Sequence, residues 1–205
     1  LYFSPGSCAL ASHIALEEAG ADYRARRVDF AANEQQSPDF LKVNPKGRVP
    51  ALVTPMGVLT ESPAMLVYIA QTHPAARLAP IEDAFAFARL QAFMSYLCST
   101  LHVAHAHRQR GRRWADDEAA LEAMRRKVPQ SVGDAFAYLE AHAFEGPFAM
   151  GSAYTVADPY LFTMARWMEG DGVDPARFPK IQAHMEAMRA RPAVQAALAA
   201  EGLAA

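Results

Sequence analysis

The chain has 205 residues, of which 52% are hydrophobic and 20% charged, and its formal net charge is -2. This length suits one large domain or two modest ones, and the low charge with aromatic residues throughout excludes a disordered chain. Without a basic excess we expect no nucleic-acid binding through bulk electrostatics. No apolar run approaches the ~18 residues of a membrane span. With two cysteines and no leader pattern, we expect a soluble, cytoplasmic protein that does not bind membranes.

The first 76 residues alternate short strand and helix signals. We predict strands at residues 1–4, 23–30, 51–54 and 58–60, the last two joined by a tight turn. A helix over residues 9–19 ends at Gly20, and a second begins at Ser62 and runs to about residue 71. The order strand-helix-strand-helix-strand-strand-helix predicts a small mixed sheet flanked by helices.

The strand signals disappear from about residue 82 onward. Helical patterns cover residues 82–109, 116–142, 155–169, 179–190 and 192–200. Pro129 lies inside the second pattern and is expected to kink or break that helix. We therefore predict two domains, an α/β domain over residues 1–76 and an all-helical domain over residues 82–205, joined by a linker around residues 73–80.

Cys8 is the first candidate for chemistry. It follows a strand and a turn and opens a helix, so backbone N–H groups and the positive end of the helix dipole point at its sulfur. This placement favours the thiolate form of Cys8 or a thiolate partner bound beside it. The alternative is a small core cysteine. The hydroxyls of Tyr2, Ser4 and Ser7 are potential donors nearby in the sequence.

Two loop segments have features that suit a peptide-like ligand. If the bond before Pro50 is cis, it leaves the N–H and C=O of Val49 free to pair with such a ligand, although a plain trans loop is the commoner conformation before a proline. Ser62 stands at a helix start as an N-cap, where free N–H groups bind a carboxylate, and Glu61 suits an ammonium group. Together Glu61 and Ser62 match the α-amino acid end of a substrate, although ordinary capping explains the same residues.

The predicted helix over residues 90–107 contains no charged residue. Helical projection gives it an apolar face of Leu90, Phe93, Met94, Leu97, Leu101 and Ala104. The opposite stripe consists of Gln91, Ser95, Cys98, His102 and His105, flanked by Ser99. A polar but uncharged stripe suits a surface covered by another domain, a partner subunit or a substrate. The histidines at 102, 105 and 107 do not converge on one helix face, so we expect no metal site.

Two further features favour structural roles. Thr155 and Asp158 have the spacing of a capping box, in which each side chain bonds the backbone at the other residue. Four arginines follow the uncharged helix, at positions 108, 110, 112 and 113. We interpret them as a solvated turn, and the alternative is that they attract anionic substrates to the mouth of a site.

Taken together, several motifs resemble the glutathione S-transferases. They are SPGSC at residues 4–8, VNPKGRVPAL at 43–52, LTES at 59–62, TVADPYLF at 155–162 and AEGL at 200–203. The cysteine after Pro-Gly and the Thr-Leu-His at residues 100–102 are similar to the bacterial beta class in particular. The resemblance covers nearly the whole chain, in order.

The resemblance implies a thioredoxin-like N-terminal domain, an all-helical C-terminal domain and a homodimer with glutathione as cosubstrate. By position, Cys8 contacts or covalently traps the glutathione sulfur, with Ser7 beside it. Val49, before a cis Pro50, pairs with the cysteinyl backbone of glutathione. The γ-glutamyl end is held by Glu61 and Ser62, and the helical domain reaches the site through Ser95, Ser99 and His102, partly from the neighbouring subunit. The chain departs from the family pattern at residues 33–36, where NEQQ replaces a segment that often contains a lysine.

The leading functional hypothesis is detoxifying conjugation, in which the glutathione thiolate attacks a small hydrophobic electrophile. His102, Ser7 or Cys8 stabilises the sulfur anion, and the electrophile lies near Phe3, Met94, and Phe162 or Trp167. A second hypothesis is disulfide exchange through Cys8 alone, because there is no Cys-x-x-Cys and Cys98 is interpreted as packing. A third is a non-catalytic carrier of glutathione or hydrophobic ligands.

Overall fold

A computed structural model describes residues 1–204. Its N-terminal part contains a four-stranded sheet in the order β2-β1-β3-β4. The strands are β1 (Tyr2–Phe3), β2 (Arg26–Arg27), β3 (Ala51–Thr54) and β4 (Gly57–Thr60). β2 runs parallel to β1, whereas β3 is antiparallel to both β1 and β4. The mixed sheet predicted from the sequence is confirmed, although the second strand is much shorter than residues 23–30.

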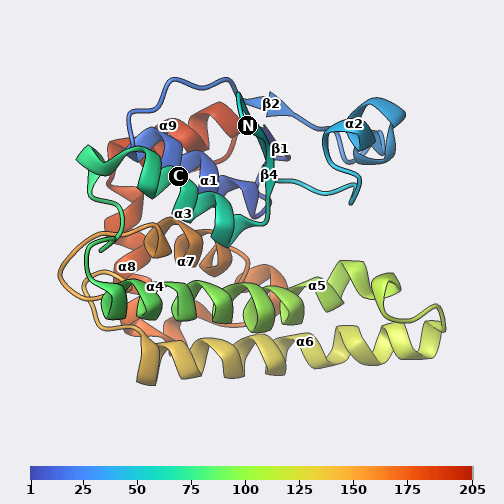
Figure 1. The fold of residues 1–205 in the computed structure, drawn as a ribbon. Coiled ribbons are helices and arrows are strands. Elements are labelled where there is room, and N and C mark those ends of the chain that lie inside the picture. The colour runs from blue at the N-terminus through green and yellow to red at the C-terminus, as the bar shows by residue number, and fades with distance from the viewer. Residues whose placement is uncertain (205) are drawn as a thin grey trace.

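Three helices accompany the sheet. They are α1 (Ala9–Glu18), α2 (Pro38–Val43) and α3 (Ser62–Thr72). α1 is buried over residues 9–16 because it packs against α3 on one side and against the helical part on the other. In Figure 1, α2 lies at the far edge of the sheet, away from the other helices.

The rest of the described chain is helical, as predicted. The main helices are α4 (Ala84–Tyr96), α5 (His102–Arg110), α6 (Glu118–Tyr138), α7 (Ala157–Ala165), α8 (Pro179–Arg189) and α9 (Pro192–Glu201). A π-helical turn at Leu97–Leu101 joins α4 and α5 into one rod, which lies alongside α6 in Figure 1. Within residues 1–204, no helix is both long and apolar enough to cross a membrane.

Helix α6 continues through Pro129, so the predicted break in this helix is wrong. Proline removes one backbone donor from a helix and costs ~3 kcal/mol in isolation. Here Val128 and Val132, on either side of it, are both buried, and Phe136 is fully buried one turn later. Burial of this apolar face holds the helix together across the proline.

The predicted capping box at the start of α7 is confirmed only in its return bond, because the capping position is Val156 and Thr155 bonds the Ala157 N–H instead of that of Asp158. Asp158 Oδ2 accepts from the Thr155 N–H at 2.7 Å, and Thr155 Oγ1 accepts from the Ala157 N–H at 3.3 Å. The other oxygen of Asp158 accepts from the Ala149 N–H at 2.7 Å and lies 2.9 Å from His184 Nε2. Asp158 is completely buried, so this carboxylate ties three segments of the helical part together.

One hydrophobic core extends through both parts of the molecule. It runs from Leu10 and Ile14 of α1 through Met65 and Leu66 of α3 to Tyr160 of α7. Burial of apolar area is the main stabilising contribution to such a contact, at about 25 cal/mol per Å². The two parts therefore hold a fixed relation to each other, and their junction can support a site.

Candidate active site

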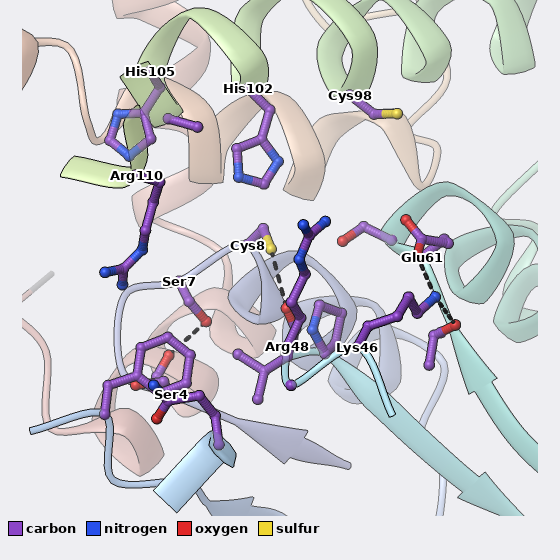
Figure 2. A pocket seen from close by; sticks show the side chains of 18 of the residues that line it. Ser4, Ser7, Cys8, Lys46, Arg48, Glu61, Cys98, His102, His105 and Arg110 are labelled. Atoms are coloured by element: carbon purple, nitrogen blue, oxygen red, sulfur yellow. Dashed lines mark hydrogen bonds and ion pairs between the residues drawn. The ribbon is translucent and has the colours of Figure 1, made fainter. Parts of the chain in front are cut away.

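A cavity of about 740 Å³ lies where the N-terminal part faces α5. The N-terminal part contributes Ser7, Cys8, the loop at residues 46–50 and the segment at residues 60–63 to its lining. The helical part contributes residues of the α4–α5 rod and of α7, together with Trp167. Figure 2 shows His102 extending from the rod toward Cys8 across this space. The structure thus brings together most of the residues singled out in the sequence.

Cys8 is the residue that immediately precedes α1, and its thiol faces the cavity. The thiol donates to the carbonyl of Val49 over an Sγ–O distance of 3.6 Å. Although part of the residue's surface is accessible from the cavity, burial of the sulfur raises the pKa of Cys8 to about 11. The Ser62 hydroxyl and a backbone N–H lower this pKa by less than burial raises it. The first alternative from the sequence, a Cys8 thiolate, is therefore wrong for the free protein, because burial outweighs these hydrogen bonds, and the second, a thiolate partner bound beside Cys8, stays a prediction.

Ser7 lines the cavity beside Cys8, but its hydroxyl proton is already engaged. Ser7 Oγ donates to the carbonyl of Ser4 at 2.7 Å and accepts from the Ala9 N–H at 3.3 Å. The side chain therefore serves the turn into α1 by satisfying one of the free backbone donors of the helix start. A ligand sulfur would have to compete with the Ser4 carbonyl for this proton.

The loop at residues 44–50 brings Val49 to the cavity. The bond between Val49 and Pro50 is cis, as the family resemblance implied, whereas the loop motif alone had left a trans bond as the stronger alternative. The buried side chain of Asn44 fixes the loop by donating to the carbonyl of Arg48 at 2.6 Å. At Val49 the polypeptide backbone therefore faces the cavity, with the long side chains of Lys46 and Arg48 on the same loop beside it.

Glu61 and Ser62 occupy the start of α3, at the opposite side of the cavity floor. Ser62 is the first residue of the helix, not its cap, and the capping position is Glu61, whose side chain makes no capping bond. The predicted Ser62 cap is therefore wrong by one residue. Glu61 has a φ of 70°, in the left-handed region, and both Glu61 and Ser62 line the cavity. Because Pro63 lacks an N–H, the free donors of this first turn are those of Ser62 and Ala64.

The Glu61 carboxylate already has a cationic partner. Lys46 Nζ lies 2.5 Å from Glu61 Oε1 and donates to Thr60 Oγ1 at 2.7 Å (Figure 2). The side chains of Lys46 and Glu61 are 45% and 65% exposed, so a ligand ammonium can exchange with Lys46 at low cost.

His102 begins α5 and faces the centre of the cavity. Burial, followed by the nearby charge of His105 and the charges of Arg113 and Arg48, lowers the pKa of His102 to about 4. His102 is therefore a neutral imidazole at physiological pH and can donate or accept one hydrogen bond without carrying a charge. Its ring lies 5.3 Å from that of Trp167.

The neighbouring histidines have structural partners. The ring of His105 stacks on Trp167 with centroids 4.1 Å apart, and its Nδ1 lies 2.7 Å from the buried Asp171. The ring of His107 packs edge-on against Trp114. Across residues 1–204, no group of three His, Cys, Asp or Glu side chains is arranged to hold a metal ion.

Ser95 and Ser99 are not brought to this cavity. Both side chains are exposed, and neither lines it, whereas Cys98, which was interpreted as packing, does. The π-helical turn at Leu97–Leu101 explains part of this difference, because a projection at 100° per residue does not hold across a wider turn. The predicted stripe therefore divides, with His102 and His105 facing the cavity and Ser95 facing outward.

The residues expected around a hydrophobic electrophile are also mostly elsewhere. Phe3, Met94 and Phe162 are buried in the core, and of the four named in the sequence only Trp167 lines the cavity. These side chains stabilise the fold and leave the cavity with a largely polar lining. Gln35 and Gln36, from the segment that departs from the family pattern, also contribute to it.

A clamp on the peptide groups of Gly6 was not foreseen in the sequence. The Gly6 N–H donates to Glu201 Oε2 at 2.9 Å, and the Gly6 carbonyl accepts from Trp167 Nε1 at 3.0 Å. The other oxygen of Glu201 lies 2.9 Å from Nδ1 of the buried His13. Two residues of the helical part thus fix the turn that precedes Cys8. The AEGL motif at residues 200–203 was the only signal for this contact.

Comparison with family models and with known proteins identifies the family to which this fold and site belong. Residues 1–71 match the model of the glutathione S-transferase N-terminal domain, and residues 106–187 match that of the C-terminal domain. The glutathione S-transferase GstA of Escherichia coli O157:H7 is 34% identical over 99% of this chain and 98% of its own length.

Two solved structures extend the comparison. A glutathione transferase homologue from Sulfitobacter, solved with bound glutathione, is 45% identical, superposes with a TM-score of 0.95, and covers 100% of this chain and 98% of its own. A bacterial beta-class enzyme from Sphingomonas chungbukensis is 38% identical with a TM-score of 0.86, over 100% and 99% of the two chains. The chain belongs to the glutathione S-transferase family. The predicted fold, a thioredoxin-like domain followed by a helical domain, is confirmed.

Proposed function

We propose that the cavity binds glutathione along its N-terminal floor, activates the glutathione thiol, and conjugates the resulting thiolate to an electrophilic carbon. The observation that carries this proposal is the convergence of Cys8, Val49, the start of α3 and His102 on one cavity. The backbone of Val49 pairs with the cysteinyl part of glutathione. The γ-glutamyl end lies at the start of α3, with its carboxylate on the free N–H groups and its ammonium beside Glu61.

Cys8 acts in this scheme as a thiol donor rather than as a nucleophile. In the free protein its S–H is directed to the Val49 carbonyl, and its pKa of about 11 keeps it protonated at neutral pH. When glutathione occupies the site, this S–H turns to the glutathione thiolate, and neutral His102 supplies a second donor from the opposite wall. The thiol proton of glutathione passes to solvent, the sulfur bonds to the electrophilic carbon, and the leaving group departs with its bonding electrons.

The same pKa argues against disulfide exchange through Cys8 as the main activity. With a pKa of about 11, on the order of one Cys8 in ten thousand is a thiolate at pH 7. Thiolates are the attacking species in thiol–disulfide exchange, so this reaction is slow in the free protein.

We also propose that the protein works as a homodimer through the outward face of α4. Residues 90–107 carry no charge, Phe85 is 76% exposed, and the serines at positions 95 and 99 are exposed on the same rod. An uncharged face with a large exposed aromatic side chain suits a second copy of the chain better than solvent. Ser95 and Ser99 would then meet the site or the interface from the neighbouring subunit.

Steady-state conjugation of aryl chlorides tests the proposal, with Cys8→Ala and His102→Gln as the variants. We expect Cys8→Ala to lower kcat about 100-fold, because a donor to the developing or bound anion is lost. Cys8→Ser, which keeps a donor, retains most of the activity. Unchanged kcat in both Cys8→Ala and His102→Gln contradicts the assigned roles. Retention on glutathione resin without turnover of any electrophile supports a carrier instead, and a rapid mass adduct with oxidised glutathione at pH 7 supports disulfide exchange.

A further inference from the structure

The charged residues that line the cavity are strongly unbalanced. Lys46, Arg48, Arg110 and Arg113 are all in its lining, and Glu61 is the only carboxylate among the described residues there. Lys46 and Glu61 pair with each other. Among residues 1–204, none of the three arginines lies within ion-pair distance of a carboxylate, so three uncompensated cations remain.

Two of these arginines come from the wall opposite the proposed glutathione site. Arg110 is the last residue of α5, and Arg113 lies in the short 3-10 turn that follows it. Figure 2 shows the Arg110 side chain extending from α5 into the cavity toward Ser7, whereas Arg48 rises from the floor next to Cys8. The guanidinium group of Arg110 also lies over the ring of Phe30, 5.7 Å from its centre, which orients it.

The neighbouring arginines of the same segment behave differently. Arg108 pairs with the buried Asp171 at 3.5 Å, and Arg112 donates to Glu118 at 3.0 Å. Neither of them lines the cavity. The segment therefore divides into two arginines that stabilise the helical part and two that face the cavity.

The positive charge reaches the centre of the site. The charges of Arg113 and Arg48 both contribute to the lowered pKa of His102. The pKa of Arg113 is itself lowered, first by burial and then by the nearby charges of Arg48 and Arg110. Bound glutathione with its thiol ionised carries two carboxylates, one thiolate and one ammonium, a net charge of two negative units. The three arginines without a carboxylate partner carry three positive charges, so one positive charge remains when glutathione is bound. The aromatic lining on the helical side, Trp114 and Trp167, offers flat apolar surfaces beside the cations.

We infer that the electrophilic substrate is an anion, an aromatic or otherwise unsaturated carboxylate whose carboxylate lies against Arg110 and Arg113. Its flat body lies against Trp114 and Trp167, with the reacting carbon toward the glutathione sulfur. This inference rests on the proposed conjugation and replaces the expectation of a purely hydrophobic electrophile. It also gives Arg110 and Arg113 a role in substrate specificity that Arg108 and Arg112 do not share.

A matched pair of aryl chlorides tests the inference at saturating glutathione. The pair is a para-chloro-dinitrobenzoate, which is an anion, and the corresponding benzamide, which is neutral. Each enzymatic kcat/KM is divided by the rate constant of the uncatalysed reaction with glutathione, so that the difference in intrinsic reactivity between the two chlorides is removed. In both reactions the sulfur bonds to the ring carbon, chloride leaves with the bonding electrons, and the thiol proton goes to solvent. We expect the wild-type protein to prefer the benzoate, with a preference that falls as salt is raised.

The variants Arg110→Gln and Arg113→Gln should each lower the normalised kcat/KM for the benzoate about fivefold, and together roughly twentyfold. The benzamide should change less than twofold, and Arg112→Gln, the matched control, should leave both substrates unchanged. Equal losses on benzoate and benzamide, or a raised KM for glutathione alone, overturn the inference by assigning these arginines to glutathione. A wild-type preference for the benzamide also overturns it.

A binding measurement separates failure of this inference from failure of the proposed function. Calorimetric titration of the protein–glutathione mixture with unreactive dinitrobenzoate, which has no leaving group, reports anion binding without turnover. Binding that weakens in Arg110→Gln and Arg113→Gln, in a protein that conjugates neither chloride, supports the anion site and contradicts the conjugating activity. Turnover of the benzamide without any binding of dinitrobenzoate supports the conjugating activity and contradicts the anion site.

Discussion

The floor and the far wall of the cavity are built in different ways. Apart from the side chains of Lys46, Arg48 and Glu61, the floor, from Cys8 through Val49 to the start of α3, consists of backbone groups and short side chains held by local turns. The far wall, from His102 to Arg113 together with Trp167, consists of long side chains of the helical part. A backbone floor suits one constant peptide substrate, whereas a wall of side chains can vary and so determines which second substrate is accepted.

The Gly6 clamp joins these two regions, and breaking it should have the largest effect. Glu201→Ala leaves the Gly6 N–H and the buried His13 without their acceptor. Unsatisfied buried polar groups of this kind cost about 1–3 kcal/mol each, so we expect the free energy of unfolding to fall by about 3 kcal/mol. Urea denaturation followed by circular dichroism measures this loss. Glu201→Gln keeps one acceptor and should lose about half as much stability. Equal stability of the wild type and both variants would contradict a stabilising role of the clamp.

The wall should also make stability depend on pH through His102. Its pKa is about 4 in the folded protein, against about 6.5 in an unfolded chain. Between these values the unfolded state binds the additional proton, so the contribution of His102 is fully present above pH 6.5 and is lost as pH falls toward 4. The full shift corresponds to at most about 3 kcal/mol, and water in the cavity reduces it.

The His102→Gln variant isolates this contribution, because glutamine does not titrate. Thermal or urea unfolding of both proteins from pH 7 to pH 4 should give a shallower loss of stability in the variant. Parallel curves for the two proteins would mean that His102 titrates near its ordinary pKa.

A smaller effect is expected where the wall touches the floor through Trp167. Trp167→Phe keeps an aromatic ring against His105 but removes the donor to the Gly6 carbonyl. The loss of one hydrogen bond of this kind is worth about 1 kcal/mol. We expect a matching loss of stability and a kcat/KM several-fold lower than that of the wild type, with the KM for glutathione little changed. A change confined to the glutathione KM would assign Trp167 to the floor instead.

The floor was largely predictable from the sequence, because it depends on local signals. The turn before Cys8 and the helix start at Glu61 each follow from prolines, glycines and polar residues close together in the chain, whereas the cis bond at Pro50 was implied only by the family resemblance. The position of the Ser62 cap was wrong by one residue, a typical error at helix ends. The helical segments were predictable in the same way from their periodicity, apart from the continuity of α6 at Pro129.

Other properties of the floor and of the wall were less predictable, because they depend on burial and on contacts distant in sequence. The protonated state of Cys8 follows from desolvation, which a helix-start argument does not include. The division between Ser95 and His102 follows from a π-helical turn that helical projection does not detect. The contact of Gly6 with Glu201 joins residues 195 positions apart, and only the folded chain reveals it.

The central claim is that the site ionises the thiol of glutathione and leaves that of Cys8 protonated. Thiolate absorbance in the ultraviolet, titrated from pH 5 to pH 10 for the wild type and for Cys8→Ser, with and without glutathione, tests it directly. Without glutathione, the two proteins should have the same absorbance up to about pH 9. With glutathione, the wild type should gain a thiolate that titrates well below the ordinary thiol value of about 8.5. A thiolate present at pH 7 in the free wild type and absent from Cys8→Ser would contradict the account.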